Sequence, residues 1–302
     1  MSRRGWALFA AMCLIWGIPY LLIKIAVSDL SPVTLVFLRT AIGALILLPL
    51  AAARGSLSPL LRYWKPILAY TVVEVALPWL LLGHAELRLS SSLTGLLVAA
   101  VPFVGVVLGL LTGADERFGA RRLVGLAVGF LGVAALVGLN VSTSDLVAAG
   151  EVGLVAIGYA LGPLIVSRRL SGVPGLGVVA VSLALPAIVY APLGLAQLPA
   201  AFPPTRVLVA VAILGVVCTA LAFMLFFALI AEVGPIRATV ITYVNPAVAL
   251  ALGVTLLGEP FTVGAVVGFA LILVGLFLAT RRGPRAKVPI VEPADVHPVE
   301  AR

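Results

Sequence analysis

Apolar runs of about 20 residues follow one another along almost the whole chain, and only short polar gaps separate them. A helix needs about 20 apolar residues to cross roughly 30 Å of hydrocarbon. We therefore expect an all-α integral membrane protein with ten transmembrane helices. The expected helices are 6–27, 32–52, 66–86, 92–112, 122–140, 151–168, 175–197, 207–230, 237–257 and 262–280.

The composition excludes an ordinary soluble domain. Hydrophobic residues make up 62% of the 302 residues, charged residues only 11%, and the mean hydropathy is +1.22. A soluble domain carries about 25% charged residues, so most of this surface must face lipid. The first run is about 22 residues long, which is too long for the apolar part of a signal peptide. We expect it to remain as a spanning helix.

The chain offers little for metal, cofactor or nucleic-acid chemistry. Its two histidines are far apart, at His84 and His297, so we expect no His-based metal site and no cofactor. Cys13 and Cys218 fall inside apolar runs and are expected to be buried without a disulfide. The net charge of +8 comes mainly from the gaps between runs, without basic and aromatic residues interleaved, so we expect no nucleic-acid partner.

The distribution of Lys and Arg predicts the orientation, because cytoplasmic segments carry an excess of both. If the N-terminus is cytoplasmic, the inner segments hold 16 of the 20 basic residues and the outer segments hold only Arg88 and Arg206. The other two, Lys24 and Arg39, fall within expected spans. We therefore expect a multi-pass protein of the cytoplasmic membrane with both termini in the cytoplasm and a disordered cytoplasmic tail at 281–302.

Two parts of the sequence match each other. Pro102 aligns with Pro246 and Gly109 with Gly253 at an offset of 144 residues. After a one-residue gap, Glu116, Gly125 and Gly132 align with Glu259, Gly268 and Gly275. Each half, 6–140 and 151–280, holds five expected helices, so homologous halves would enter the membrane from opposite sides. Inverted repeats of this kind occur in many secondary transporters, with the substrate site near the midplane between the halves.

The sequence resembles a ten-helix member of the drug/metabolite transporter superfamily built from two EamA-type domains. The segments that carry the likeness are WGIPYLLIK (16–24), FLRTAIGALIL (37–47), SSLTGLLVAAVPFV (91–104) followed by ER (116–117), and ATVITYVNPAVALALGVTLLGEPFT (238–262). The resemblance covers nearly all of 6–280 and implies export of amino acids or other small metabolites. The loop TGADERFG of the first half departs from the usual Leu-Gly-Glu pattern of the family, so the resemblance implies no role for Glu116.

Ionisable residues inside a bilayer are costly and are therefore candidates for function. Trp16, Tyr20 and Lys24 recur every four residues and would share one face of the first helix, where Pro19 removes a backbone donor. Lys24 either lines a water-accessible path or extends to the outer surface. Arg39 lies about seven residues into the second helix. It is expected to anchor an ion pair or hydrogen bond, with substrate contact as the alternative.

Glu74 is the one acidic residue expected near mid-membrane. It would pair with Arg39, bind a substrate amine, or exchange a proton that couples transport. Pro78 lies one helical turn further on, and Trp79 is expected to join the wall of the site.

The outer ends of two helices carry further charges. His84 and Glu86 are expected at a wet interface, with a place at the outer mouth facing Lys24 as the alternative. Glu259 is expected at a helix end rather than in a substrate site.

The ninth expected helix carries a second polar stripe. Thr239, Thr242, Tyr243 and Pro246 share one face, and Asn245 points elsewhere and would hydrogen-bond a neighbouring helix. The stripe either contacts substrate or only joins helices. Tyr159 on the sixth helix would add to the cavity. The expected gating residues are Pro19, Pro78, Pro102 and Pro246.

These features favour a secondary transporter that moves a small amphipathic metabolite by alternating access. Its partners would be a small-molecule substrate and the lipid bilayer, and the oligomeric state is left open. The alternative is an integral membrane enzyme that acts on a lipid-linked substrate. Such chemistry generally needs clustered acids or histidines, and the loops offer only Asp115 beside Glu116. We therefore expect no enzymatic activity.

Overall fold

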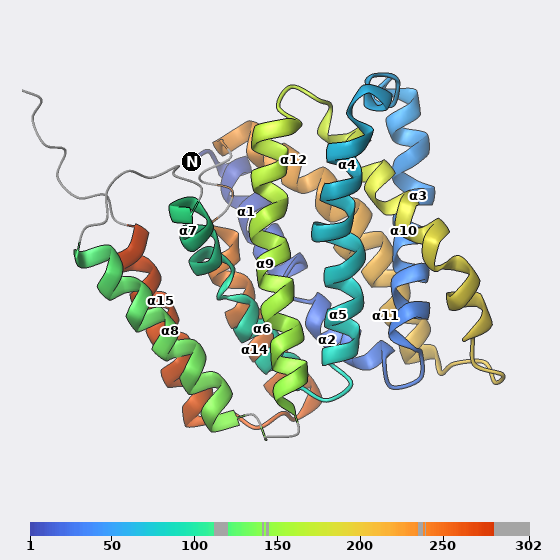
Figure 1. Cartoon of the computed structure of the whole chain (residues 1–302). Coiled ribbons are helices and arrows are strands. Elements are labelled where there is room, and N and C mark those ends of the chain that lie inside the picture. The colour runs from blue at the N-terminus through green and yellow to red at the C-terminus, as the bar shows by residue number, and fades with distance from the viewer. Residues whose placement is uncertain (112–119, 141, 143–144, 235–237, 239, 281–302) are drawn as a thin grey trace, which may run out of the picture.

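The computed structural model describes residues 1–111, 120–140, 142, 145–234, 238 and 240–280, and the regular structure within these residues is entirely helical. The expected all-helical fold is confirmed, whereas the expected tail at 281–302 and Glu116 lie outside the described residues. Figure 1 shows the helices standing side by side in a bundle. They are α1 (Arg3–Ile15), α2 (Pro19–Ala26), α3 (Pro32–Ala53), η1 (Ser58–Tyr63), α4 (Trp64–Tyr70), η2 (Thr71–Ala76), α5 (Leu77–Ala85), α6 (Ser91–Val98), α7 (Val101–Leu111), α8 (Ala120–Asn140), α9 (Leu146–Arg169), α10 (Gly175–Ala196), α11 (Thr205–Gly215), η4 (Val216–Leu221), α12 (Ala222–Val233), α14 (Ile241–Leu257) and α15 (Val263–Thr280).

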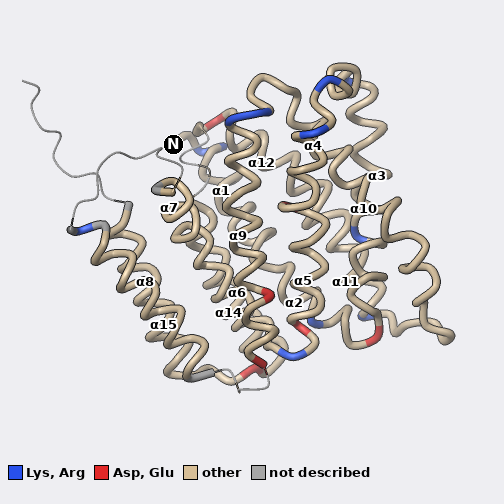
Figure 2. The backbone as a smooth tube through the Cα atoms, in the orientation of Figure 1, with Lys and Arg blue, Asp and Glu red and all other residues tan. Residues whose placement is uncertain are grey.

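Seven helical segments of the described chain are long and apolar enough to cross a membrane: Arg3–Ala26, Pro32–Ala53, Ser58–Ala85, Ser91–Gly109, Leu146–Arg169, Gly175–Ala196 and Thr205–Val233. Three shorter apolar helices, Leu123–Gly138, Ile241–Leu257 and Val263–Ala279, occupy the expected ranges 122–140, 237–257 and 262–280. Figure 2 shows that the charged residues gather near the two ends of the bundle, with few between them. This distribution is that of a bundle with lipid around its middle.

The first expected helix is interrupted. The expected range 6–27 is divided between α1 and α2, because residues Trp16, Gly17 and Ile18 leave the helix and Pro19 starts a new one. Gly17 lies against α14, where a Cβ on Gly17 would fall 2.5 Å from the side chain of Val248. The interruption therefore lets the first segment approach α14 closely, and Trp16 and Tyr20 do not share one continuous helical face.

A side chain of α14 binds the backbone at this interruption. With its amide oriented so that the nitrogen faces two carbonyl oxygens, Asn245 donates to Cys13 O at 3.1 Å and to Ile241 O at 2.9 Å. Gly17 N–H bonds Leu14 O instead of continuing the regular helical pattern, so the Cys13 carbonyl needs another donor. The expected interhelical hydrogen bond of Asn245 is confirmed.

The fourth expected helix is also divided. Its range 92–112 forms α6 and α7, which are separated by Ala99 and Ala100. Pro102 is the second residue of α7, where its missing N–H breaks no helical hydrogen bond. The matched helix α14 instead runs unbroken through Pro246.

Two short π-helical segments occur at matched places, one in each half of the sequence. Segment η2 joins α4 to α5, and η4 joins α11 to α12, with their first and last residues 145 positions apart. In η4 the Thr219 hydroxyl donates to Leu214 O, five residues earlier, at 2.8 Å. Such widened turns are rare and often occur at functional sites.

Helices α8 and α15 pack through glycines and run antiparallel. A Cβ on Gly125 would fall 2.7 Å from Gly275 O, and one on Gly132 would fall 2.8 Å from Gly268 O. These are four of the six glycines that match between the two halves of the sequence. Figure 1 shows the two helices crossing at the edge of the bundle. Small residues at such a crossing let the two backbones touch.

Helices α3 and α10 form another close antiparallel pair. Thr34 Oγ1 donates to Gly194 O at 2.9 Å near one end of the pair. Near the other end, Gly177 lies so close to Ser56 O that a Cβ there would collide with it. The pair brings the middle of α3, with Arg39, next to the second half of the chain.

Candidate functional site

Arg39 is held at the centre of the bundle by residues from both halves of the chain. It is buried, its Nε donates to Thr219 Oγ1 at 3.0 Å, and its guanidinium carbon lies 3.6 Å from the centre of the Trp79 ring. A desolvated cation on a tryptophan face is a favourable arrangement. The expected hydrogen-bond anchor is therefore present. No acidic partner of Arg39 lies within ion-pair distance among the described residues.

Two tyrosines complete what we call the central polar cluster: Tyr20, Arg39, Trp79, Tyr159 and Thr219. Tyr20 on α2 is buried, and Tyr159 on α9 packs against the same apolar side chains. Both tyrosines lie within electrostatic range of Arg39. Tyr159 also packs beside Trp79. The cluster thus combines one cation with aromatic rings and hydroxyl groups in a setting that is otherwise apolar.

Glu74 lies in η2 on the α9 side of the cluster. Its Oε2 is buried and has no hydrogen-bond partner among the described residues. The carboxyl group fits against Gly162, where a Cβ would collide with it, and Tyr70 and Tyr159 are its titratable neighbours. The pairing with Arg39 that the sequence suggested is not found among these contacts. Nearby, Pro78 packs against α9, where a Cβ on Gly158 would lie 3.1 Å from its ring.

Lys24 binds backbone rather than a side chain. Its Nζ donates to Glu86 O at 2.5 Å and to Leu89 O at 2.8 Å, in the turn between α5 and α6. The Glu86 side chain is fully buried, so the expectation that Glu86 is wet was wrong. The physical reason is that Glu86 lies on the side of the turn that packs against α2, where Lys24 bonds its carbonyl, whereas Leu87 and Arg88 of the same turn are exposed. His84, by contrast, is half exposed, and its Nδ1 lies 2.7 Å from Glu151 Oε1.

Glu259 caps a helix of the other half. Its Oε1 accepts from Ser91 N at 2.7 Å, and its Oε2 accepts from Ser92 N at 2.9 Å and from the Ser92 hydroxyl. Gly258 precedes it with a φ of 67°, a left-handed conformation that glycine adopts without strain. The expected helix-end role of Glu259 is confirmed, and a carboxylate at the first N–H groups of α6 is electrostatically favourable.

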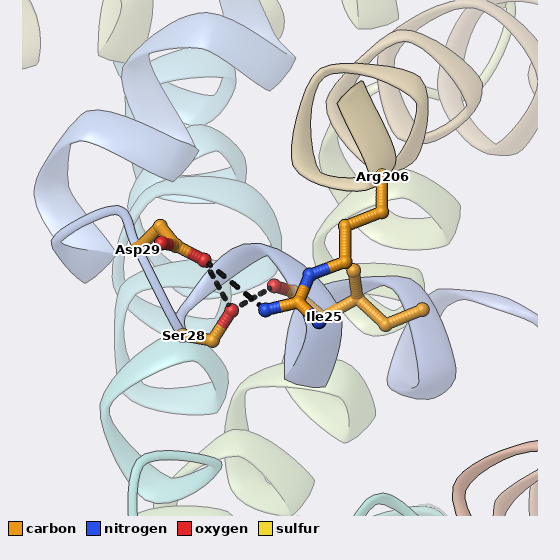
Figure 3. Close-up of polar contacts among 4 residues, drawn as sticks. All are labelled: Ile25, Ser28, Asp29 and Arg206. Atoms are coloured by element: carbon orange, nitrogen blue, oxygen red, sulfur yellow. Dashed lines mark hydrogen bonds and ion pairs between the residues drawn. The ribbon is translucent and has the colours of Figure 1, made fainter. Parts of the chain in front are cut away.

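A weaker contact joins the two halves at the surface. The Ser28 hydroxyl lies 2.8 Å from Ile25 O and 2.6 Å from Asp29 Oδ2, and Arg206 Nη2 lies 3.9 Å from the same Asp29 oxygen (Figure 3). The Arg206 side chain is 70% exposed. Surface pairs of this kind contribute little to stability.

Other residues expected at the site lie apart from the central polar cluster. Trp16 packs against Phe223 and Phe226 of α12, with ring centres 5.9 Å and 4.7 Å away. Tyr243 packs against the apolar cluster formed by α6, α8 and α15. Thr242 lies on α14 beside it, and Thr239 is outside the described residues. The structure therefore joins Tyr20, Arg39, Trp79 and Tyr159, with Glu74 beside them, but not the stripe of α14.

Two cavities lie toward the ends of the bundle. One of 390 Å³ is lined by Ser90, Ser92, Leu250, Pro260 and Thr262, among others. The other, of 570 Å³, is lined by Arg54, Ser56, Gly175, Met224 and Phe227, among others. Neither of these two is lined by Trp16, Glu74 or Tyr243. The described residues also contain no group of three or more His, Cys, Asp and Glu side chains placed to bind a metal.

The sequence profile of the EamA-like transporter family matches the chain twice, at residues 3–138 and at residues 152–281. The chain belongs to the EamA-like transporter family. This assignment makes it a multi-pass membrane transporter of the drug/metabolite transporter superfamily, and it confirms the resemblance found in the sequence.

Similar proteins agree with the family. The uncharacterized transporter YvbV of Bacillus subtilis is 24% identical over 298 residues, which is 94% of each chain. The uncharacterized inner membrane transporter YedA of Escherichia coli is 29% identical over 284 residues, covering 89% of this chain and 90% of YedA. The crystal structure of another protein aligns with this chain with a TM-score of 0.66 and 21% sequence identity, covering 92% of this chain and 98% of the other. This structural likeness concerns the fold alone.

Some residues of the site were not found from the sequence of this EamA-family transporter. Thr219 was missed because a threonine inside an apolar run looks like a core residue. One signal was available, since Thr219 lies 145 positions after Glu74, the same spacing that relates η2 to η4. Ser91 and Ser92 were also missed as partners of Glu259, because they precede it by 168 and 167 residues and lie in the other half of the sequence.

Proposed function

We propose that this EamA-family protein is a secondary transporter that exports small amphipathic metabolites such as amino acids by alternating access. The observation that carries the proposal is the buried hydrogen bond between Arg39 of the first half and Thr219 of the second half. A buried cation with an aromatic neighbour is held at the centre by one residue from each half. Ionisable residues kept at this depth generally serve substrate or ion pathways.

We further propose that the transporter consists of two inverted five-helix repeats, 6–140 and 151–280. The two matches to the family profile support this division. So do the contacts of the π-helical segments. Segment η4 of the second half packs on α3 of the first half, and η2 of the first half packs on α10 of the second half, where the Thr71 hydroxyl bonds Ser182 Oγ at 2.9 Å. Two repeats related by a two-fold axis in the membrane plane are expected to make such contacts in equivalent pairs, each between an element of one repeat and an element of the other.

The substrate class follows from the groups in and beside the central polar cluster. Arg39 would receive a carboxylate, and the free Oε2 of Glu74 would receive an amine or a proton. Tyr20, Trp79 and Tyr159 would face the apolar part of the substrate. A small number of placed polar groups among aromatic rings is typical of a small-molecule site.

Alternating access requires places where helices bend or separate. Pro19 lies at the interruption of the first helix and Pro102 just after that of the fourth. Pro78 follows η2, and Pro246 lies inside α14. Each proline removes one backbone donor, so the helices bend at these positions at lower cost. We propose that these four prolines mark the gating points.

The direction of transport and the orientation rest on charge. Sixteen basic residues fall in one set of expected loops and two in the other. Both termini are accordingly placed in the cytoplasm. The cavity of 570 Å³ beside Arg54 and Gly175 then opens toward the cytoplasm, as loading for export requires.

Counterflow in proteoliposomes tests the function. Vesicles loaded with one unlabelled amino acid at a time should accumulate the same labelled amino acid when the wild-type protein is present. Arg39→Lys keeps the charge but loses the planar stack on Trp79, and it should lower the initial rate roughly tenfold. Arg206→Lys makes the same exchange at the surface and serves as the matched control. Equal rates for the two variants, or no counterflow with any amino acid, would refute the proposal.

A further inference from the structure

Glu86 is an unusual residue in this protein. It ends α5, its side chain has no exposed surface, and neither Oε1 nor Oε2 has a hydrogen-bond partner among the described residues. A carboxylate without donors in apolar surroundings is much less stable than the neutral acid. The site is therefore built for a carboxylic acid that carries its proton.

Lys24 lies beside Glu86 without forming an ion pair with it. Its ammonium group donates to the main-chain carbonyls of Glu86 and Leu89. The Glu86 carbonyl lies at the C-terminal end of α5, where the helix dipole favours a cation, and the Leu89 carbonyl lies in the turn that follows. The Lys24 ammonium group therefore lies next to the Glu86 carboxyl group, but its hydrogen bonds go to backbone carbonyls.

The other charged or titratable groups around Glu86 are already engaged. Arg39 bonds Thr219 and stacks on Trp79, and Glu259 accepts from Ser91 and Ser92. On α9, Glu151 pairs with the half-exposed His84. Tyr20 on α2 is the remaining titratable neighbour and is buried. Lys24 is the cation best placed to respond to a change of charge on Glu86, because its ammonium group already bonds the main-chain carbonyl of that residue.

We propose that Glu86 is a proton-binding site of the transporter and that Lys24 is the residue that responds when the proton leaves. The O–H bond of the carboxyl group breaks, the proton passes to water, and the carboxylate remains. The Lys24 ammonium then leaves the carbonyls of Glu86 and Leu89 and donates to the carboxylate. No further reactant is needed.

The movement of Lys24 from the backbone carbonyls to the Glu86 carboxylate affects a contact between the two halves. The turn that Lys24 holds at Glu86 and Leu89 leads directly into Ser91 and Ser92, which Glu259 of the other half binds. When Lys24 releases the turn, the start of α6, to which Glu259 binds, therefore becomes less firmly held. Proton loss at Glu86 is in this way linked to separation of the halves at this end of the bundle.

The inference rests on the proposed transport function, but its first test does not need a substrate. The probe is the proton itself, observed by infrared difference spectroscopy of the protein in lipid nanodiscs during a pH titration. A protonated carboxyl group gives a carbonyl band that a carboxylate lacks. Because Glu74 is a second buried acid, Glu74→Gln is the background in which the titration is made.

In Glu74→Gln the band of a protonated acid should persist at neutral pH, and it should be absent from the double variant Glu74→Gln/Glu86→Gln. Addition of Lys24→Met to Glu74→Gln removes the cation that stabilises the carboxylate, so the band should persist to higher pH. A merely structural lysine would not move this titration. If Glu86→Gln leaves the band unchanged, or Lys24→Met leaves the titration midpoint unchanged, the proposal is wrong.

Counterflow separates this inference from the proposed function. If the infrared band behaves as expected but no amino acid exchanges, the transport proposal fails and the proton site stands. If exchange occurs and Glu86→Gln responds to a pH gradient as the wild type does, the proton site fails and transport stands.

Discussion

Arg39 and Thr219, 180 residues apart in the chain, meet through a single hydrogen bond of 3.0 Å at the centre of the bundle. The bond exists because α3 packs against η4, where the π-helical turn leaves the Thr219 hydroxyl between Leu214 O and Arg39. One side chain thereby satisfies a buried carbonyl and a buried guanidinium together. The hydrogen bond that connects the two halves of the sequence here is therefore also part of the central polar cluster.

Removal of the Thr219 hydroxyl should destabilise the protein. Thr219→Val keeps the shape but leaves Arg39 Nε without an acceptor, which should cost about 1–3 kcal/mol. Thermal unfolding in detergent measures the change. The control is Thr255→Val, since Thr255 is exposed and its hydroxyl bonds only Ala251 O of its own helix. Equal melting temperatures for the two variants would contradict this account of Arg39.

The contact between Glu259 and α6 should depend on Gly253. A Cβ there would lie 2.8 Å from Ser91 Oγ and closer still to Ser92 Oγ and Glu259 Oε2. Gly253→Ala should therefore push Glu259 off the helix terminus and destabilise the protein by about 1–3 kcal/mol through overpacking.

Gly153→Ala is the matched control, because a Cβ at Gly153 meets nothing within 4 Å. Helix propensity predicts a gain of up to about 1 kcal/mol for this variant. Unfolding curves of the two alanine variants should move in opposite directions. A shared direction would show that the clash at Gly253 does not exist.

The crossing of α8 and α15 should be equally intolerant of side chains. A Cβ on Gly275 would fall 2.6 Å from Gly125 O, so Gly275→Ala must separate the two helices. We expect a lower melting temperature and increased proteolysis of the protein in detergent. At Gly138 on α8 a Cβ meets nothing within 4 Å, so Gly138→Ala should neither lower the melting temperature nor increase proteolysis. Loss of stability in both variants would point to a general effect of alanine instead.

The surface pair of Asp29 and Arg206 should contribute almost nothing. At 3.9 Å and with Arg206 mostly exposed, the pair is expected to contribute less than about 1 kcal/mol. Arg206→Gln should therefore unfold at the wild-type temperature, at low and at high salt. A large salt-dependent shift would mean that this contact (Figure 3) holds the two halves together.

Cysteine labelling tests the orientation. Cys13 and Cys218 are both buried, so their replacement by alanine gives a background with little perturbation of the surface. In that background, Ser28→Cys should react with an impermeant maleimide added outside whole cells, and Ser58→Cys should react only after lysis. The reverse pattern would place the termini outside the cell.

Much of the fold could be predicted from the sequence because lipid leaves few alternatives to helices. Apolar length located the helices, and four of the six glycines that match between the halves meet at the α8 and α15 crossing. The interruptions were harder to see. Pro19 and Pro102 were visible, but Pro246 lies in an unbroken helix, so proline alone did not decide where a helix stops. The packing of Gly17 against Val248 on a distant helix contributed as well.

The candidate site was predicted less completely. Arg39, Trp79, Tyr20 and Tyr159 stood out as polar or aromatic residues in apolar runs, and the structure brings them together. Depth along a helix does not give the surroundings of a side chain, however. Glu86 was expected in water because it is near a helix end, yet its side chain is fully buried although Leu87 and Arg88 beside it are exposed. The partner of Arg39 was not inferred either, because a threonine hydroxyl in an apolar run carries no charge that would mark it.

Each π-helical segment holds one residue more than a regular helix of the same height would hold. That surplus rotates everything beyond it by about 100° relative to what precedes it. The position of such an extra residue can shift to the next turn when a few backbone hydrogen bonds change partners, and the helix does not have to unwind. Migration of the bulge by one position would therefore turn the Glu74 or Thr219 side chain in a new direction.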